Sequence, residues 1–334
     1  MKQKKRYFCG VDFGGTAAKI GIVDEQGKLF GTEHQDILPS QSYEDIFGIV
    51  AHYIRRRCRE LDVNVTAIGV GSPGFIDRTE GRVLQGSENL PVFKNRSLVN
   101  YLREDFMLPV FADNDANCAA AGELMFGIGV GYDSFVMITL GAGVGGALVL
   151  DGRVFRGTRG LAGEIGHLCL DAQGPFCSCG SRGCLEQYVS TWAIERSDRE
   201  KVAKRAGAAS TGTRPVKASG GSSGRKPGNQ PITAETVFGR AKAGDPLAVE
   251  VVRETAEHIA RAFGSLVNIF NPQACIIGGG ISAAGKALLE PVQERIADFA
   301  WPLPLQDVKI QIAALQNDAG VLGAAAQCLE RLEG

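Results

Sequence analysis

Three cysteines and one histidine near the middle of this sequence form a complete set of ligands for one zinc ion. Cys177, Cys179 and Cys184 follow His167 within a short, glycine-containing segment. Thiolates with one imidazole are the donors that structural zinc sites use, and four protein ligands leave no open position for a reacting water. The spacing therefore predicts a zinc ion that shapes a loop rather than one that takes part in a reaction. The alternative is that these residues bind no metal.

Glycines and carboxylates in and around this segment extend its possible chemistry. Gly180 and Gly183 can supply the positive φ angles that a tight loop around a metal requires. Glu164 precedes the segment and Glu186 follows it, and His167 could bind metal through one ring nitrogen and donate from the other. Carboxylates at both ends of a stiffened loop are well placed to accept hydrogen bonds from a polyhydroxylated ligand. The alternative is that both are simply solvated.

Two glycine-rich turns, each between two apolar segments, could hold the phosphate groups of a nucleotide. The first lies between predicted strands at residues 7–11 and 18–23 and contains Gly14, Gly15 and Thr16, with Lys19 beyond it. The second lies between predicted strands at 135–140 and 147–150 and contains Gly141, Gly143 and Gly145. Glycine lets backbone N–H groups approach anionic oxygens, and a hydroxyl and an ammonium group can assist. Either turn alone could equally be an ordinary β-turn.

The two turns also occupy equivalent positions in a repeated pattern. Gly14 precedes Asp24 by the same offset by which Gly141 precedes Asp151, and each aspartate closes the second strand of its hairpin. Such a repeat indicates a duplicated half. We therefore expect one hairpin in each of two domains, with the two turns facing each other across a cleft.

A third glycine cluster follows a predicted strand at 274–277 and precedes a predicted helix at about 283–299. It consists of Gly278, Gly279 and Gly280. Glycines at a strand-to-helix turn let a ligand pack against bare backbone beside a helix N-terminus. A tight connection with no ligand is an equally good explanation of this pattern.

A carboxylate at a strand end is the candidate for chemistry. Asp113, Asn114 and Asp115 follow a predicted strand at 109–112 and begin an alanine-rich helix that is expected to run to about Phe126. At least one of these polar residues should cap the helix. Asp115 is also expected to point into the cleft where α/β domains bind ligands, and an ionised aspartate there can accept a hydroxyl proton during phosphoryl transfer.

Composition excludes several classes of protein. The chain has 334 residues, 44% of them hydrophobic, and a formal net charge of −1. We expect two domains, no electrostatic affinity for nucleic acid and no binding to anionic membranes. No signal peptide is recognisable, and the most apolar window, residues 135–150, is interrupted by glycines and is not a membrane span. The cysteines outside the cluster occur singly, which is typical of reduced thiols in a cytoplasmic protein.

The C-terminal half contains one strong helical pattern and one segment without a pattern. Apolar residues between Val249 and Phe270 recur at spacings of three and four up to Asn271, which predicts a helix with a core-facing or dimer-facing stripe. Residues 197–231 are rich in Gly, Ser, Ala, Lys and Arg. This composition cannot bury a core, and we expect a mobile loop there.

Taken together, these motifs resemble the ROK family of bacterial repressors, open-reading-frame proteins and sugar kinases, in its zinc-containing, glucokinase-like branch. The resemblance covers nearly the whole chain. It implies an α/β fold of two actin-like (ribonuclease H-like) domains around a central cleft. The smaller domain would comprise residues 1–117 and 319–334, and the larger one residues 118–318. The larger domain would contain the cysteine loop, residues 167–186, and the insertion at 197–231.

The resemblance also implies a function, ATP-dependent phosphorylation of a hexose, with the 6-hydroxyl of glucose as the favoured acceptor and Asp115 as the general base. It implies Mg²⁺ with the ATP, a structural Zn²⁺ and a homodimer or homotetramer. The implied sugar contacts are Ser72, Asn89, Asn114, Asp115, Glu164, His167 and Glu186. The implied nucleotide contacts are Asp12, Gly14, Gly15, Thr16, Lys19, Gly141, Ala142, Gly143, Gly145, Gly278, Gly279 and Gly280.

Several alternatives remain within this resemblance. Kinases for N-acetylmannosamine, N-acetylglucosamine, fructose and allose share the motifs, and Ala142 stands where relatives usually have threonine. A non-catalytic, sugar-responsive regulator would need a helix-turn-helix module before the first hairpin, which only residues 1–6 precede. A sugar-binding relic would be expected to lack Asp115. Polyphosphate-specific enzymes generally lack the cysteine loop, so ATP is the favoured donor.

Overall fold

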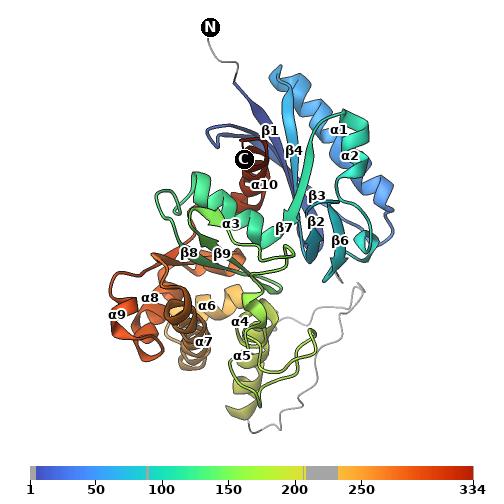
Figure 1. The fold of residues 1–334 in the computed structure, drawn as a ribbon. Helices are drawn as coiled ribbons and strands as arrows, with labels where there is room; N and C mark the ends of the chain where they lie inside the picture. Colours follow the sequence, from blue (N-terminus) through green and yellow to red (C-terminus); the bar gives the residue numbers. More distant parts are fainter. Residues whose placement is uncertain (1–4, 88–89, 206, 208–231, 334) are drawn as a thin grey trace.

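Two five-stranded sheets with the same strand order form the frame of the molecule (Figure 1). The computed structural model describes residues 5–87, 90–205, 207 and 232–333. The first sheet has the order β3-β2-β1-β4-β7, and its strands are β1 (Tyr7–Phe13), β2 (Ala17–Asp24), β3 (Leu29–Asp36), β4 (Val65–Ser72) and β7 (Val110–Asn114). The second has the order β10-β9-β8-β11-β12, and its strands are β8 (Phe135–Leu140), β9 (Val144–Leu150), β10 (Arg153–Val154), β11 (Ala274–Gly278) and β12 (Lys309–Ile312).

The two sheets repeat one topology. In the first, β1, β2 and β3 are antiparallel neighbours, and β4 and β7 add parallel to β1. In the second, β8, β9 and β10 are antiparallel neighbours, and β11 and β12 add parallel to β8. The predicted duplication is therefore confirmed, because each glycine-rich turn joins the first two strands of its own sheet.

The half of the molecule with the first sheet also contains two helices and a small hairpin. They are α1 (Tyr43–Leu61), α2 (Asn100–Phe106), β5 (Phe75–Asp77) and β6 (Arg82–Gln85), with the 3₁₀ turn η1 (Pro91–Phe93). Ser42 and Asp45 form a capping box that starts α1. The buried face of α1 includes Phe47, which packs with Phe13 and Phe93 at ring-centroid distances of 5.6 and 5.8 Å. Aromatic burial thus fixes α1 against the strand that leads to the first glycine turn.

Most of the remaining helices pack on the second sheet and form the lower half of the molecule in Figure 1. They are α4 (Glu186–Val189), α5 (Thr191–Arg205), α6 (Ala234–Lys242), α7 (Pro246–Phe270), α8 (Lys286–Arg295) and α9 (Pro302–Leu305), with 3₁₀ turns η2 (Ile165–His167), η3 (Gly280–Ala284), η4 (Ile296–Asp298) and η5 (Gln316–Asp318). Asp245 caps the start of α7, and Asn271 ends it in a left-handed conformation with φ 45°. The predicted helix and its stop are confirmed, and most of its apolar stripe is buried in the core.

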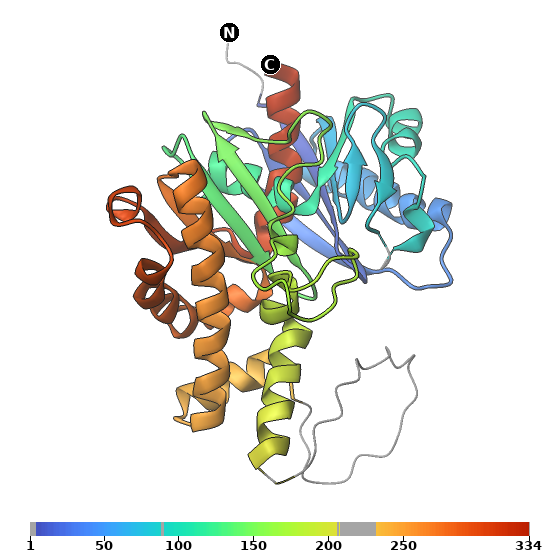
Figure 2. The same cartoon turned by 60° about the horizontal axis from the view of Figure 1, so that its bottom comes forward.

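Helices α3 (Asp115–Phe126) and α10 (Ala319–Glu333) cross between the two sheets, as both views show (Figures 1 and 2). The crossing is very close. A Cβ on Gly323 would lie 1.6 Å from the carbonyl oxygen of Cys118, and one on Gly122 would lie 3.0 Å from the Gly323 nitrogen. Helix α10 also rests directly on the first sheet, where a Cβ on Gly69 would lie 1.7 Å from the Ala324 carbonyl oxygen. Only glycine allows these backbones to approach so closely.

A buried carboxylate reinforces this crossing. Glu123, near the end of α3, has no exposed surface and accepts hydrogen bonds from three backbone N–H groups. The donors are Ile128 at 2.8 Å, Ala314 at 3.2 Å and Leu315 at 2.7 Å. The latter two belong to the segment between β12 and α10. One side chain thus ties the end of α3 to the chain that leads into α10.

Two predicted segments differ from the structure. Helix α5 continues through Arg205, so the first part of the segment predicted as a mobile loop is helical. The helix is held because Asp198 pairs with Arg240 (2.7 Å), and Lys201 pairs with Glu250 and with a further glutamate of α7. Residues 206 and 208–231 of that prediction lie outside the described residues.

The helix predicted at 283–299 is divided into η3, α8 and η4, because Gly285 has a φ of 61° between the first two. Among the described residues, no helix combines the length and the apolar character needed to cross a membrane.

The helix crossing leads to a stability prediction. Gly323→Ala should destabilise the protein by about 3 kcal/mol or more, because its Cβ meets backbone that cannot move without separating α3 from α10. Gly239→Ala in α6 is the matched control, since no described atom lies within 4 Å of a Cβ there, and it should stabilise by about 0.5–1 kcal/mol. Unfolding midpoints measure both effects. Equal midpoints for the two variants would contradict the close crossing.

Candidate active site

The strand end that carries the candidate base is fixed by a helix cap. Asn114 ends β7 in an extended conformation, and its side-chain oxygen accepts hydrogen bonds from the N–H groups of Ala116 (2.9 Å) and Asn117 (3.2 Å). The expectation that a polar residue here caps the helix is confirmed. The Nδ2 of Asn114 donates to the carbonyl oxygen of Gly74 at 3.2 Å. The Asn114 side chain thus links the helix start to Gly74 and, through its second N–H, to Asp115.

Asp115 is half-buried at the first position of α3. Burial raises the pKa of Asp115 above its ordinary value of 3.8, while hydrogen bonds from the Ala116 N–H (2.9 Å) and from the Asn114 side chain oppose that rise. A carboxylate with a raised pKa is a better proton acceptor. The local structure thus suits Asp115 for general-base chemistry.

Asp12 lies at the end of β1, and its carboxylate is close enough to Asp115 for the two charges to interact. Burial, followed by the charge of Asp115, raises the pKa of Asp12 to about 7, and the Lys19 ammonium group partly opposes this. A Cβ on Gly320 would lie 2.1 Å from Asp12 Oδ2, so this carboxylate rests against the first turn of α10. Two carboxylates therefore converge where the first sheet meets α3 and α10.

The tips of both glycine hairpins are open to an approaching ligand. Neither Gly14 nor Gly141 has a positive φ. Among the described residues, the nearest atom to a Cβ on Gly14 would be the Ala17 carbonyl oxygen at 3.4 Å, and nothing lies within 4 Å of one on Gly141. Neither backbone conformation nor packing requires glycine at these positions. Close approach of a ligand to the backbone would explain why both positions are glycine.

The second hairpin contacts both the helix of the candidate base and the third glycine cluster. A Cβ on Gly145 would lie 2.9 Å from the Cβ of Ala116, in the first turn of α3. Gly279 has a φ of 78°, and a Cβ there would lie 2.4 Å from the carbonyl oxygen of Leu140, which immediately precedes Gly141. Two of the three predicted nucleotide motifs are therefore adjacent, and one of them touches the helix of Asp115.

Thr191 anchors the second hairpin, which sequence reasoning did not predict. Its backbone N–H and its hydroxyl both donate to the carbonyl oxygen of Gly141, at 2.8 and 2.9 Å. Thr191 begins α5 and belongs to no recognisable motif. Only the fold brings it to the hairpin.

Three residues implied as ligand contacts are placed differently or lie outside the described structure. The Lys19 ammonium group forms an ion pair with Asp318, so it is already partnered. Ser72 pairs in register with Asn114, and its side chain has no exposed surface. Asn89 lies outside the described residues. Lys19 and Ser72 therefore have contacts within the protein, and their contacts with ligands stay predictions.

Glu164, His167 and Glu186 surround the second hairpin. Glu186 Oε2 accepts a hydrogen bond from the Val144 N–H at 3.0 Å, directly beside the hairpin tip. Glu164 is exposed to solvent, but partial burial of its carboxyl group raises its pKa above the ordinary value of 4.5. The charges of Asp115 and Glu186 add to that rise, and His167 opposes it. These side chains therefore share one electrostatic environment with the candidate base.

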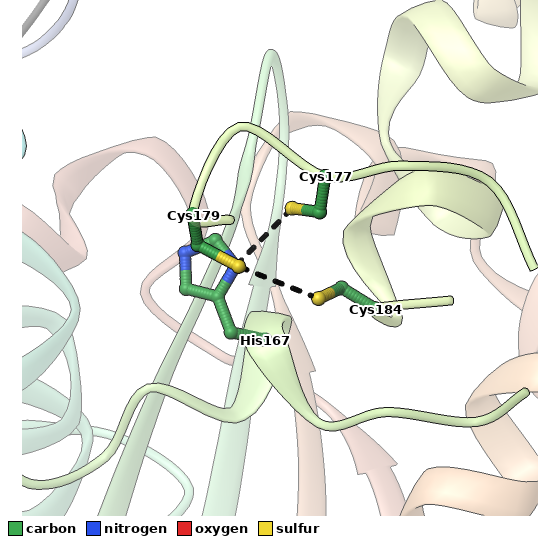
Figure 3. A group of neighbouring side chains, drawn as sticks. All are labelled: His167, Cys177, Cys179 and Cys184. Carbon is green, nitrogen blue, oxygen red and sulfur yellow. Dashed lines mark hydrogen bonds between the residues drawn. The ribbon is translucent and has the colours of Figure 1, made fainter. Parts of the chain in front are cut away.

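The four predicted metal ligands come together in space (Figure 3). One donor atom from each of His167, Cys177, Cys179 and Cys184 lies within 4.8 Å of the others. Cys177 Sγ is 3.6 Å from His167 Nδ1, and Cys179 Sγ is 3.6 Å from Cys184 Sγ. Tetrahedral ligands at a Zn–S distance of about 2.3 Å would be about 3.8 Å apart. The donor set and its spacing fit a zinc ion.

The backbone of the cysteine loop explains how these donors meet. The Cys177 N–H donates to the Ser181 carbonyl oxygen (2.8 Å), and the Leu185 N–H donates to that of Leu168 (2.9 Å), which closes the loop on itself. Gly180 and Gly183 have φ angles of 96° and 61°. The predicted need for positive φ at both glycines is confirmed.

The sequence also did not predict a buried ion pair next to the site. Asp113, directly before the helix cap, is buried and lies 2.7 Å from the Arg156 side chain, which comes from beyond β10. The position of Asp113 in the motif could have drawn attention to it. Arg156 has no sequence signal, because only the sheet arrangement brings it there.

The fold and the site define a class of two-domain α/β proteins with an actin-like architecture. The ROK hexokinase from Thermus thermophilus superposes with a TM-score of 0.77 and 31% identity, covering 98% of this chain and 100% of that one. The ROK glucokinase from Streptomyces griseus, in complex with glucose and AMPPNP, superposes with a TM-score of 0.75 and 30% identity, covering 96% and 98% of the two chains.

Sequence comparison gives the family. The model of the ROK family matches residues 8–331, and the chain belongs to this family. The glucokinase of Thermotoga maritima is 36% identical over 342 residues, which span 99% of each chain. The family resemblance and the fold class inferred from the motifs are thus confirmed.

The cysteine loop gives a prediction about metal content. The protein purified without chelators should contain one zinc per chain, and Cys179→Ser should lose most of it and unfold at a lower temperature, because a hydroxyl is a poor replacement for a thiolate ligand. Cys169→Ser is the control, since Cys169 lies in the same loop but outside the cluster. Elemental analysis that found no zinc in the parent protein would refute the metal site.

Asp12 gives a prediction about pH. The folded protein holds this proton more tightly than the unfolded chain, so Asp12 favours folding below pH about 4 and loses that contribution as pH rises to about 7. Asp12→Asn should therefore flatten the fall of the unfolding midpoint across this range. Asp245→Asn is a control of opposite sign, because Arg240 lowers the pKa of Asp245. An unchanged pH profile in Asp12→Asn would contradict the raised pKa.

Proposed function

We propose that this chain transfers the terminal phosphoryl group of ATP to a hexose, with the 6-hydroxyl of glucose as the acceptor. It is an ATP-dependent sugar kinase. The observation that carries this proposal is the position of Asp115, a half-buried carboxylate at a strand end, on a helix that touches the second glycine hairpin. Relatives named glucokinase, and a related structure that holds glucose and AMPPNP, support it.

The phosphates of ATP are bound by the two hairpins. Their tips are open at Gly14 and Gly141, where no side chain keeps anionic oxygens away from the backbone. The turn at residues 278–280 lies beside the second hairpin and receives the nucleoside. Magnesium, when bound with ATP, neutralises charge on the phosphate oxygens. Ala142 offers no hydroxyl to these phosphates, so backbone donors carry more of the binding.

The sugar is bound between the cysteine loop and the strand end that carries Asp115. Glu164 and Glu186 can accept hydrogen bonds from sugar hydroxyls, and Asn114 can donate one in place of its hydrogen bond to Asp115. Zinc bound by the cysteine loop would hold His167 in place directly and Glu186 through Cys184, two residues earlier. The metal therefore stabilises the sugar site without taking part in the reaction.

Asp115 acts as the general base. Its carboxylate takes the proton from the sugar 6-hydroxyl as the oxygen attacks the terminal phosphorus of ATP, and ADP leaves. Burial favours this transfer because it raises the pKa of Asp115. Little covalent chemistry is required of the protein, and positioning supplies most of the rate.

An assay of ADP release over a panel of hexoses tests the proposal. Glucose should give the highest kcat/KM, and N-acetylmannosamine, N-acetylglucosamine, fructose and allose should give lower values. Removal of one hydroxyl that is hydrogen-bonded in the site should lower kcat/KM strongly, because it leaves buried polar groups unpaired. A change that affects only apolar contacts should lower kcat/KM less. ADP release with none of these sugars would refute kinase activity, and a different best sugar would reassign the acceptor.

The assignment of the base gives a direct prediction. Asp115→Asn should keep the fold and bind sugar but lose about 10²–10⁴ in kcat, because the amide keeps the shape and cannot take the proton. Asp151→Asn is the matched control, since Asp151 is an exposed aspartate in the turn after β9, and it should keep parental activity. Turnover of Asp115→Asn within about tenfold of the parent would remove Asp115 from this role.

A further inference from the structure

A group of four charges, of which Asp113 and Arg156 are buried, adjoins the candidate base. Asp113 is 1% exposed, and its Oδ2 accepts a hydrogen bond from Arg156 Nε at 2.7 Å. Arg78 Nε lies 3.1 Å from the same oxygen. Both Arg156 terminal nitrogens donate to the carboxylate of Glu330 at 2.9 Å. Two guanidinium groups and two carboxylates thus form a balanced network, in which removal of one member would leave a buried charge unpaired.

The network joins three separate parts of the fold. Asp113 belongs to β7 of the first sheet, and Arg156 follows β10 at the edge of the second. Glu330 is on α10, the helix that crosses α3. Arg156 also donates to the Val154 carbonyl oxygen at 3.1 Å, which fixes the guanidinium to its own strand. Arg156 is therefore the member through which the second sheet contacts the end of β7.

The other oxygen of Asp113 holds the first turn of the base's helix. Asp113 Oδ1 accepts hydrogen bonds from the backbone N–H of Asn114 at 2.9 Å and from Asn117 Nδ2 at 3.2 Å. Asn114 is the cap of α3, and Asp115 is the next residue. Because Arg156 binds one oxygen of this carboxylate and the helix start binds the other, a rotation of Asp113 would move Asn114 and Asp115 together.

We propose that Arg156 is a positioning residue for the phosphoryl transfer: held by Glu330, it fixes Asp113 and thereby the placement of Asp115. This inference rests on the proposed function. A planar guanidinium can bind two carboxylates in fixed directions, which an ammonium group cannot do. Displacement of a catalytic group by about 1 Å can reduce turnover on the order of 10²-fold.

The test compares two arginines that each pair with a buried aspartate. Arg156→Met removes the network's central member. Arg240→Met is the matched control, since Arg240 lies 2.7 Å from Asp198, which has no exposed surface and is on α5. Arg156→Lys retains the charge, but an ammonium group cannot reproduce the directed hydrogen bonds of the planar guanidinium. Unfolding midpoint, hexose affinity, KM and kcat are measured for all three variants.

Arg156→Met should lower kcat by about tenfold or more while hexose KM changes by less than about threefold, because the base is misplaced whereas the sugar contacts of Glu164 and Glu186 remain. Arg156→Lys should recover only part of that loss. Arg240→Met should lose a similar amount of stability and keep kcat within about twofold. If Arg156→Met fails to fold, Glu330→Gln frees the guanidinium on its exposed side and should lower kcat in the same direction.

Unchanged kcat in Arg156→Met, or an equal loss in Arg240→Met, would overturn the positioning role. Full recovery by Arg156→Lys would show that charge alone suffices, which also contradicts it. The parent protein and Asp115→Asn separate this inference from the proposed function. A parent that phosphorylates no hexose refutes the function itself, whereas an active parent with an inactive Asp115→Asn and an active Arg156→Met refutes only the role of Arg156.

Discussion

The close crossing of α3 and α10 is the contact on which the rest of the structure depends. Gly122 and Gly323 let the two helices meet backbone to backbone, and Glu123 binds the segment that leads into α10. Since α3 begins at Asp115 and α10 begins beside Asp12, this crossing sets the distance between the two carboxylates. The position of the candidate base is therefore a consequence of helix packing between the sheets as well as of its own strand.

The second hairpin touches α3 at Ala116 and is held from its own side by the start of α5 and by Glu186 of the cysteine loop. Thr191 holds the tip at Gly141, and Glu186, which follows the loop, accepts a hydrogen bond from Val144 at the same tip. The cysteine loop thus lies beside the proposed phosphate site as well as the proposed sugar site. A change at one of these sites is expected to be felt at the other, because Glu186 belongs to both.

Local chemistry explains what could be predicted from the sequence. The metal ligands, the glycine turns and the cap at Asn114 lie within short segments, where spacing alone specifies geometry. Contacts over long sequence separations could not be predicted this way. The ion pair of Lys19 with Asp318 was not foreseen, and residues 197–205, predicted as part of a mobile loop, form the end of α5 through ion pairs with α6 and α7. Arg156 carried no signal for the same reason.

The carbon of glucose that receives the phosphate shows whether Asp115 is the base, since Asp115 must face one particular hydroxyl of the bound sugar. Uniformly ¹³C-labelled glucose is incubated with the protein and Mg-ATP, and the carbon–phosphorus couplings of the product are measured by NMR. We expect one sugar phosphate, with phosphorus coupled through oxygen to C6. Phosphate on another carbon, or release of inorganic phosphate alone, would contradict it.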